Sequence, residues 1–200
     1  MPTIALPVSP IDGLHTIEFG AGDEPLLQRF FDANPFYFLA ITGEPAGPTD
    51  AHEGIHDQLP PSFPHTRKRV VGYLGADGEV VALANVIVDL FVADVWHIGT
   101  FIVATARHGS GDAQLLYRSV EDWARANGAR WMRLNVVVGH VRAERFWWSR
   151  GYMQTSDRKG IVMGKRTNTL RVMIKPLADN TLDAYLALVE RDRPEQPTAR

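Results

Sequence analysis

The sequence contains no cysteine among its 200 residues. This absence excludes a disulfide framework, a thiolate nucleophile and a zinc site built from cysteine ligands. The chain also carries little net charge, because 21 Lys and Arg nearly balance 23 Asp and Glu, for a formal charge of −2. A protein that binds nucleic acid by neutralising phosphates needs an excess of basic side chains. We therefore expect no nucleic acid among its partners.

Long hydrophobic runs are absent as well, since no stretch approaches 18 consecutive apolar residues. The first ten residues lack a basic region followed by an apolar core, and they carry Pro2, Pro7 and Pro10. We expect neither a membrane-inserted nor a secreted protein, no membrane partner and a cytoplasmic location. Residues 1–10 are expected to form a loose arm.

The overall composition is that of an ordinary globular domain, with 45% hydrophobic and 22% charged residues. A chain of this length can bury about 70% of its unfolded surface in one core. No internal repeat or second boundary is visible, so we expect a single domain over residues 1–193. Residues 194–200 are expected to be a disordered tail.

The most informative stretch predicts a strand, a glycine loop and a helix, in that order. Residues 95–103 are rich in β-branched and aromatic side chains, as a strand requires. Gly109 and Gly111 follow, and apolar residues then recur at helical spacing up to Asn127 and Gly128. A helix that begins in glycines offers free backbone N–H groups and the positive end of its dipole, which together bind phosphates.

Two families of phosphate loop have this order of elements. The dinucleotide fingerprint needs a third glycine, where this chain has Gln114, and an acidic residue at the end of the next strand. That strand, predicted at residues 131–138, ends in valines instead. The dinucleotide interpretation is therefore rejected.

The stretch resembles the acyl-CoA loop of the GNAT superfamily of N-acetyltransferases. Gly111 and Ala113 fill the two small positions of that loop, and His108 stands where the family usually has Gln or Arg. The family's downstream motif is matched at four positions, namely Ala143, Phe146, Gly151 and Tyr152. His140 and Trp147 depart from it, replacing an asparagine and a tyrosine. The resemblance by motif covers residues 68–155.

This resemblance implies an α/β fold with a mixed, largely antiparallel sheet of six or seven strands flanked by about four helices. It implies transfer of an acetyl group from acetyl-CoA to an amine, with a small-molecule amine as the expected acceptor, by direct attack in a ternary complex. A homodimer is possible in this family, and residues 169–177 could supply an edge strand for it. The residues expected to bind acetyl-CoA are Phe101, Ile102, Val103, His108, Gly109, Ser110, Gly111, Asp112, Ala113, His140 and Trp147.

His97 is the candidate catalytic residue, because the resemblance places it where part of the family carries a carboxylate base. A histidine with a pKa near 6.5 could take a proton from the attacking amine. The alternative is a structural, hydrogen-bonded histidine. Trp147 stands at the position of the family's acid tyrosine, but an indole N–H is no practical acid. His140 could contact the pantetheine or cap the helix that follows it.

Residues 52–56 read His-Glu-Gly-Ile-His, the pattern of a zinc-protease helix, with His52, Glu53 and His56 in the motif positions. Gly54 lies between the histidines, prolines follow at 60 and 61, and no apolar stripe anchors the segment. We expect a solvated loop and no metal site, with zinc hydrolysis as a distant alternative. The other alternative is a non-catalytic acyl-CoA-binding protein of the same fold.

Elsewhere, periodicity predicts the remaining elements of one domain. Residues 43–66 contain five prolines, so we expect an irregular segment with at most one or two helical turns. Strands are predicted at residues 14–19, 68–74, 79–89, 153–163 and 169–177, and helices at 24–32, 140–150 and 181–190.

Overall fold

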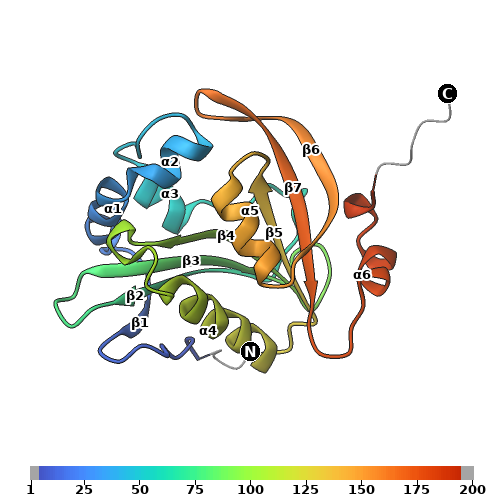
Figure 1. Ribbon diagram of the computed structural model, residues 1–200, viewed down its shortest axis with the longest axis horizontal. Coiled ribbons are helices and arrows are strands. Elements are labelled where there is room, and N and C mark those ends of the chain that lie inside the picture. Colours follow the sequence, from blue (N-terminus) through green and yellow to red (C-terminus); the bar gives the residue numbers. More distant parts are fainter. Residues whose placement is uncertain (1–4, 195–200) are drawn as a thin grey trace.

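The computed structural model describes residues 5–194, so most of the predicted tail at 194–200 lies outside the described residues. Its centre is a seven-stranded sheet with the order β1-β2-β3-β4-β5-β7-β6 (Figure 1). Only β4 and β5 are parallel to each other, and every other neighbouring pair is antiparallel. The strands are β1 His15–Glu18, β2 Arg67–Leu74, β3 Val80–Val88, β4 Val95–Val103, β5 Trp131–Val137, β6 Met153–Met163 and β7 Arg166–Pro176.

Six α-helices cover the two faces of this sheet. They are α1 Glu24–Ala33, α2 Pro35–Ile41, α3 Asp50–His56, α4 Asp112–Ala126, α5 Val141–Ser149 and α6 Leu182–Leu188. The predicted fold class is confirmed. The two helices beyond the expected four are short. α2 comes from an apolar run to which no element was assigned, and α3 gives two turns to the proline-rich segment. The solvated loop expected at residues 52–56 is therefore wrong, because these residues belong to α3, whose Ala51 is buried.

The core divides according to which helices cover the sheet. On one face α4 and α5 pack over Trp96, Ile98 and Leu134. On the other face α1 to α3 cover β2 and β3, while α6 covers Trp131 and Ile174. Apolar residues at helical spacing make α4 amphipathic, and burying its Leu116, Tyr117, Val120 and Trp123 fixes it to the sheet.

Two expectations about the chain's edges are wrong. The described part of the N-terminal arm is not loose, because Trp123 Nε1 donates to the carbonyl of Ala5 at 2.6 Å and Ser119 Oγ to that of Val8 at 2.7 Å. The strand expected at 169–177 is not an edge strand, because β7 lies between β5 and β6. It therefore cannot offer a free edge to a second copy of the chain.

The β6–β7 hairpin is long and reaches across to the end of α2 (Figure 1). Lys165 N, at its tip, donates to the carbonyl of Thr42 at 2.8 Å, and Asn168 Nδ2 donates to that of Ile41 at 2.8 Å. Gly164 approaches Thr42 so closely that a Cβ there would lie 2.9 Å from the Thr42 carbonyl oxygen. The hairpin therefore closes one end of the space above β4 and β5.

Within residues 5–194, no helix combines the length and the apolar character needed to cross a bilayer.

Candidate functional site

The parallel strands β4 and β5 are paired only over their first halves. Their pairing runs from Val95 opposite Trp131 to Ile98 opposite Leu134, although β4 continues to Val103 and β5 to Val137. Gly99 lies at a register shift against β3, since Ile98 and Thr100 face consecutive residues there. Such a bulge bends its strand and increases its twist. The two strands therefore separate beyond Ile98, where part of the β4 backbone is left without a β5 partner.

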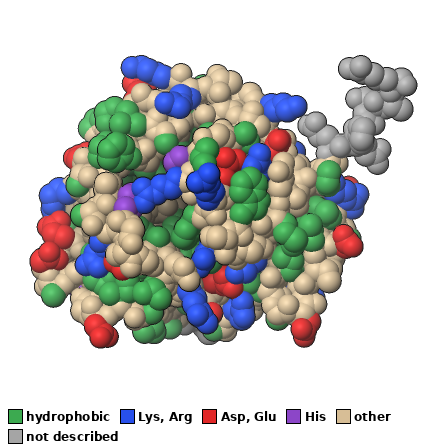
Figure 2. Space-filling view, viewed as in Figure 1, with side chains coloured by type: hydrophobic (Ala, Val, Ile, Leu, Met, Phe, Trp, Pro, Cys, Tyr) green, Lys and Arg blue, Asp and Glu red, His purple; other side chains and the backbone are tan. Residues whose placement is uncertain are grey.

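A cavity of about 540 Å³ opens beside this separation. Figure 2 shows a hollow on this face, with hydrophobic side chains at its floor and histidine and basic side chains at its rim. The end of β4, the first turn of α4, α5 and the start of α2 all contribute to its lining. Of the described residues that line it, Arg142 and Arg145 are charged and none is acidic. Their charge makes this cavity suited to an anionic ligand.

Glycines shape the loop that enters α4. Gly109 has φ 90° and Gly111 has φ 92°, values that side-chain-bearing residues rarely adopt. The Asp112 carboxylate accepts a hydrogen bond from Arg107 Nη1 at 2.8 Å, and this bond lowers the pKa of Asp112. This ion pair with Arg107 holds the Asp112 side chain in place at the start of α4. At the start of α4, Asp112 N donates to Ser110 Oγ at 3.2 Å and Gln114 N donates to the carbonyl of Gly111 at 3.0 Å, so the N–H groups of Gly111 and Ala113 are the ones left for a ligand.

The predicted cofactor residues fall into two groups around this cavity. Those that line it directly are Phe101, Ile102, Val103, His108, Ala113, His140 and Trp147. The loop residues Gly109, Ser110, Gly111 and Asp112 are not among the lining residues, but they connect two residues that are, His108 and Ala113. His108 Nε2 lies 3.0 Å from the carbonyl of Val103, which ties the loop to the end of β4. Their role in binding acetyl-CoA stays a prediction.

Aromatic side chains fill the space between α4, α5 and β4. Phe101 and Phe146 stack with ring centroids 6.1 Å apart, and Trp147 meets Tyr117 edge to face at 5.4 Å. Tyr117 donates to the hydroxyl of Tyr152 at 3.2 Å, and burial raises the pKa of both phenols. Neither phenol lines this cavity or the smaller one beside it, so the structure gives no acid from this group.

His97 lies on the other face of the sheet, in a buried ionic network. Arg133 Nη1 is 3.1 Å from His97 Nδ1, and Arg133 also binds Asp192 at 2.7 and 3.1 Å. Burial first, and then the charge of Arg133, hold the pKa of His97 well below its usual value. Because a guanidinium can only donate, Nδ1 must accept, and the proton of the neutral ring stays on Nε2. The base role expected for His97 stays a prediction, and this hydrogen bond opposes it.

The smaller cavity, of about 220 Å³, lies between the separated strands. His97, Asn135 and Thr100 contribute polar atoms, whereas Ile41, Met163 and Leu170 belong to its apolar wall. Of the described residues that line it, none is acidic, Lys or Arg. The hairpin that reaches α2 supplies Met163 and Leu170, so hairpin and helix together enclose this space. The cavity fits a small ligand with a mostly apolar body.

The two cavities meet. Tyr37, Phe101, His140, Ala143 and Trp147 line both of them. The hydroxyl of Tyr37 lies 3.4 Å from Thr100 Oγ1, and burial raises the pKa of this phenol. Burial first, and then the charge of Arg142, lower the pKa of His140, so its imidazole is neutral at pH 7. One of the two roles expected for His140 was to cap the helix that follows it. This expectation is wrong, because the His140 side chain makes no capping hydrogen bond to α5.

Three residues that line the cavities, Arg142, Arg145 and Tyr37, were not predicted as site residues from the sequence. Arg142 and Arg145 are spaced three apart within the predicted helix at 140–150, so a helical projection would have placed them on one side. Tyr37 offered no comparable signal, because its position depends on how α2 lies against β4. Asn34 sets that position, since its Oδ1 accepts from Thr105 N at 2.6 Å just after β4.

Comparisons with known proteins by sequence and by structure both find acetyltransferases. The model of the acetyltransferase (GNAT) family matches residues 38–152. No match to a curated protein was found by sequence comparison.

Solved structures with the same fold cover most of the chain. An acetyltransferase from Thermus thermophilus is 20% identical, with a TM-score of 0.65 over 86% of this chain and 100% of that one. The ribosomal-protein-S18-alanine N-acetyltransferase from Escherichia coli is 13% identical, with a TM-score of 0.62 over 85% and 97%. The spermidine N-acetyltransferase from Vibrio cholerae, in complex with CoA and spermine, is 16% identical, with a TM-score of 0.62 over 83% and 96%.

Proposed function

Since its sequence from 38 to 152 matches the family model, this chain belongs to the acetyltransferase (GNAT) family, and we propose that it transfers the acetyl group of acetyl-CoA to the amine of a small, largely apolar acceptor. The observation that carries the proposal is the meeting of two cavities between β4 and β5. The larger is bordered by arginines and the first turn of α4, whereas the smaller is uncharged and enclosed.

The larger cavity is assigned to acetyl-CoA. Backbone N–H groups at the start of α4 would hold the pyrophosphate, where Gly109 and Gly111 have no side chain to obstruct it. Arg142 and Arg145 add positive charge on the opposite wall. The unpaired side of β4 from Phe101 to Val103 would hydrogen-bond the amide groups of the pantetheine arm, as an added strand does.

Two side chains at the junction are proposed to serve the reaction. Acetyl-CoA supplies a thioester, whose carbonyl carbon forms a bond to the amine nitrogen as its bond to sulfur breaks. His140, neutral at pH 7, is proposed to accept the proton that the amine loses. Tyr37 keeps its proton because burial raises its pKa, so its hydroxyl would donate a hydrogen bond to the departing sulfur. The proton taken by His140 then passes to the sulfur through water, so CoA leaves as a thiol and His140 returns to its neutral form.

The smaller cavity sets the acceptor class. A polyamine carries several positive charges that a buried site must pair with carboxylates. The described lining of this cavity contains none, and aliphatic and aromatic side chains form most of its walls. An amine attached to an apolar body is therefore the preferred acceptor, and spermidine should be a poor one.

The experiment that tests this proposal is a thiol-release assay with acetyl-CoA and matched amines. Arylalkyl and branched alkyl amines should release CoA in step with formation of the N-acetyl product, and spermidine should be turned over at least about tenfold less efficiently. Preference for spermidine would contradict the acceptor class. Tight binding of acetyl-CoA without release from any amine would instead support the non-catalytic alternative.

A further inference from the structure

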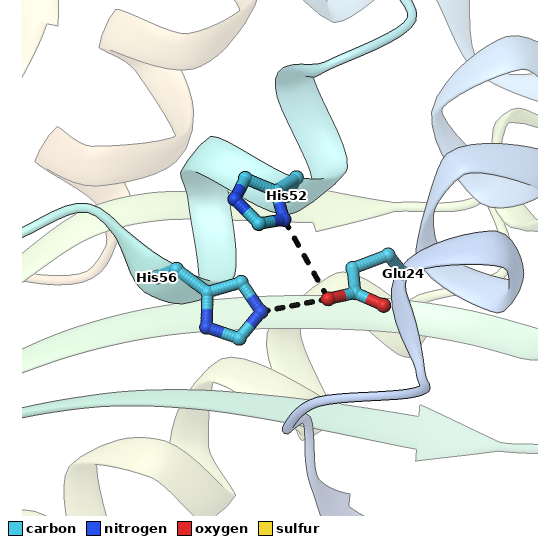
Figure 3. A group of neighbouring side chains, drawn as sticks. All are labelled: Glu24, His52 and His56. Atoms are coloured by element: carbon cyan, nitrogen blue, oxygen red, sulfur yellow. Dashed lines mark hydrogen bonds and ion pairs between the residues drawn. The ribbon is translucent and has the colours of Figure 1, made fainter.

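Three side chains from two helices, none of them in the lining of either cavity, converge on one another (Figure 3). His52 and His56 project from α3, and Glu24 projects from the first turn of α1. His56 Nε2 lies 2.7 Å from Glu24 Oε1, and His52 Nδ1 lies 3.6 Å from the same oxygen. The two imidazole centroids are 4.6 Å apart. One carboxylate oxygen and two imidazole nitrogens thus face a common point.

We propose that Glu24, His52 and His56 bind a divalent transition metal ion, with Zn²⁺ as the ion that their chemistry favours. Two imidazoles and one carboxylate form a ligand set typical of Zn²⁺, and histidines four residues apart lie on the same side of a helix. Hard ions such as Mg²⁺ and Ca²⁺ prefer oxygen ligands and would bind this set poorly.

The spacing of the ligand atoms fits such an ion. The three lie within 4.8 Å of one another. Bonds of about 2.0–2.1 Å in a tetrahedral site place neighbouring ligand atoms roughly 3.4 Å apart. The separation of His52 from Glu24 is already close to this length. The shorter His56–Glu24 contact is a hydrogen bond whose proton the metal would replace, which requires a small movement of one side chain.

The carboxylate is also held in place from behind. Its second oxygen, Oε2, accepts a hydrogen bond from Gly22 N at 3.2 Å, so Oε1 stays directed at the histidines. Groups that orient a metal ligand in this way contribute measurably to affinity.

The inference is a binding site and not a hydrolytic centre. Glu53, which would be the base of a zinc protease, accepts a hydrogen bond from Thr49 Oγ1 at 2.6 Å. The side chain of His52 is 63% exposed, so water would complete the coordination. None of the three residues lines either site cavity. A bound ion would join α1 to α3 and stabilise the layer that contains α2.

Calorimetric titration of the full chain, carrying no added histidine tag, tests the inference with Zn²⁺ alone. One ion should bind per chain, and Mg²⁺ should not compete. His52→Ala and His56→Ala should each weaken binding by at least about tenfold. The matched control is His15→Ala, because His15 is an exposed histidine on β1, and this variant should bind like the wild type.

Two further measurements protect the result from a folding artefact. Circular dichroism without metal should show the same fold for all four proteins. Co²⁺ in place of Zn²⁺ should give the visible absorption of a tetrahedral site in the wild type and lose it in both α3 variants. Absence of Zn²⁺ binding to the wild type, or equal binding to the folded His52→Ala and His56→Ala proteins, would overturn the inference.

Discussion

Arg133 Nη1 lies 3.1 Å from Nδ1 of His97, and the same guanidinium is bound to the buried Asp192. His97 therefore points its accepting nitrogen at a cation that is itself fixed. A neutral imidazole whose Nδ1 accepts from a guanidinium has no free lone pair for an amine proton. His140 stands at the junction of the two cavities and is not engaged in this network.

Exchange of each histidine should separate their roles. We expect His140→Ala to lower kcat by about 10²–10⁴-fold and to flatten the acid side of the pH profile, because a general base is lost. That side should lie below pH 6.5 in the wild type, since the pKa of His140 is lowered. His97→Ala should retain most of kcat. The opposite pattern, measured as kcat and kcat/KM against pH, would return the base role to His97.

The hydroxyl of Tyr37 offers a narrower test. Tyr37→Phe should lower kcat by about tenfold, in line with the loss of roughly one hydrogen bond of 1.4 kcal/mol, while acetyl-CoA affinity stays unchanged. Tyr73→Phe is the matched control, because the buried Tyr73 hydroxyl binds Ser119 Oγ at 3.1 Å and lines neither site cavity. Equal kcat for Tyr37→Phe and wild type would remove Tyr37 from the reaction.

The tip of the β6–β7 hairpin should control the acceptor cavity. A Cβ at Gly164 would lie 2.7 Å from Thr42 Cβ and 2.9 Å from its carbonyl oxygen, so Gly164→Ala must push the hairpin away from α2. We expect a several-fold rise in the KM for the amine with no change in acetyl-CoA affinity. Gly160 also has a positive φ, but a Cβ added there would meet no atom within 4 Å. Gly160→Ala therefore isolates the effect of backbone strain. Equal amine KM values in the two variants would contradict this role for the contact.

Asp192 anchors the C-terminal segment and should govern stability. Besides Arg133, it accepts from Tyr185 OH at 2.5 Å and lies 3.2 Å from Arg158 Nη2. Asp192→Asn leaves the buried Arg133 without its counter-charge, so unfolding should become easier by about 3–5 kcal/mol. Denaturant unfolding at pH 7 measures this loss. Asp183→Asn, in the first turn of α6, is the control and should change stability by less than about 1 kcal/mol.

The same aspartate gives a pH dependence of known sign. Burial acts to raise the pKa of Asp192, but the hydrogen bonds and charge of Arg133 outweigh it and leave the pKa below its usual value. A lowered folded-state pKa adds stability above the unfolded pKa of about 3.9, and this stability is lost as the pH falls through the folded value. The stability difference between wild type and Asp192→Asn should therefore shrink on acidification below about pH 4.

Local patterns were sufficient to predict the centre of the fold. The order β4, glycine loop and α4 follows from side-chain spacing and from Gly109 and Gly111, and the structure confirms this order. The β2–β3 hairpin follows from two apolar runs around Asp77 and Gly78. These features depend on residues close in sequence, which is why periodicity and turn chemistry reach them.

Features that depend on distant contacts were not accessible in this way. Tyr37 enters the site only because Asn34 binds the backbone after β4, a contact across 71 residues. Glu24 meets His56 across 32 residues, so the motif at 52–56 showed no third ligand in sequence. The ionic environment of His97 likewise needs Asp192 from the far end of the chain. Sequence spacing can identify candidate residues of this kind, but their contacts depend on how distant parts of the chain pack together.

The most direct test of the central claim is thermal unfolding with and without acetyl-CoA. At about 100 times its dissociation constant, a ligand adds near 2.7 kcal/mol, which should raise Tm by roughly 5–10 °C for a chain of this size. Arg142→Glu combined with Arg145→Glu should abolish most of the rise, while Arg118→Glu, exposed on α4, should keep it. A wild-type Tm that does not respond to acetyl-CoA, or a full response in the double variant, would contradict the assignment of the larger cavity.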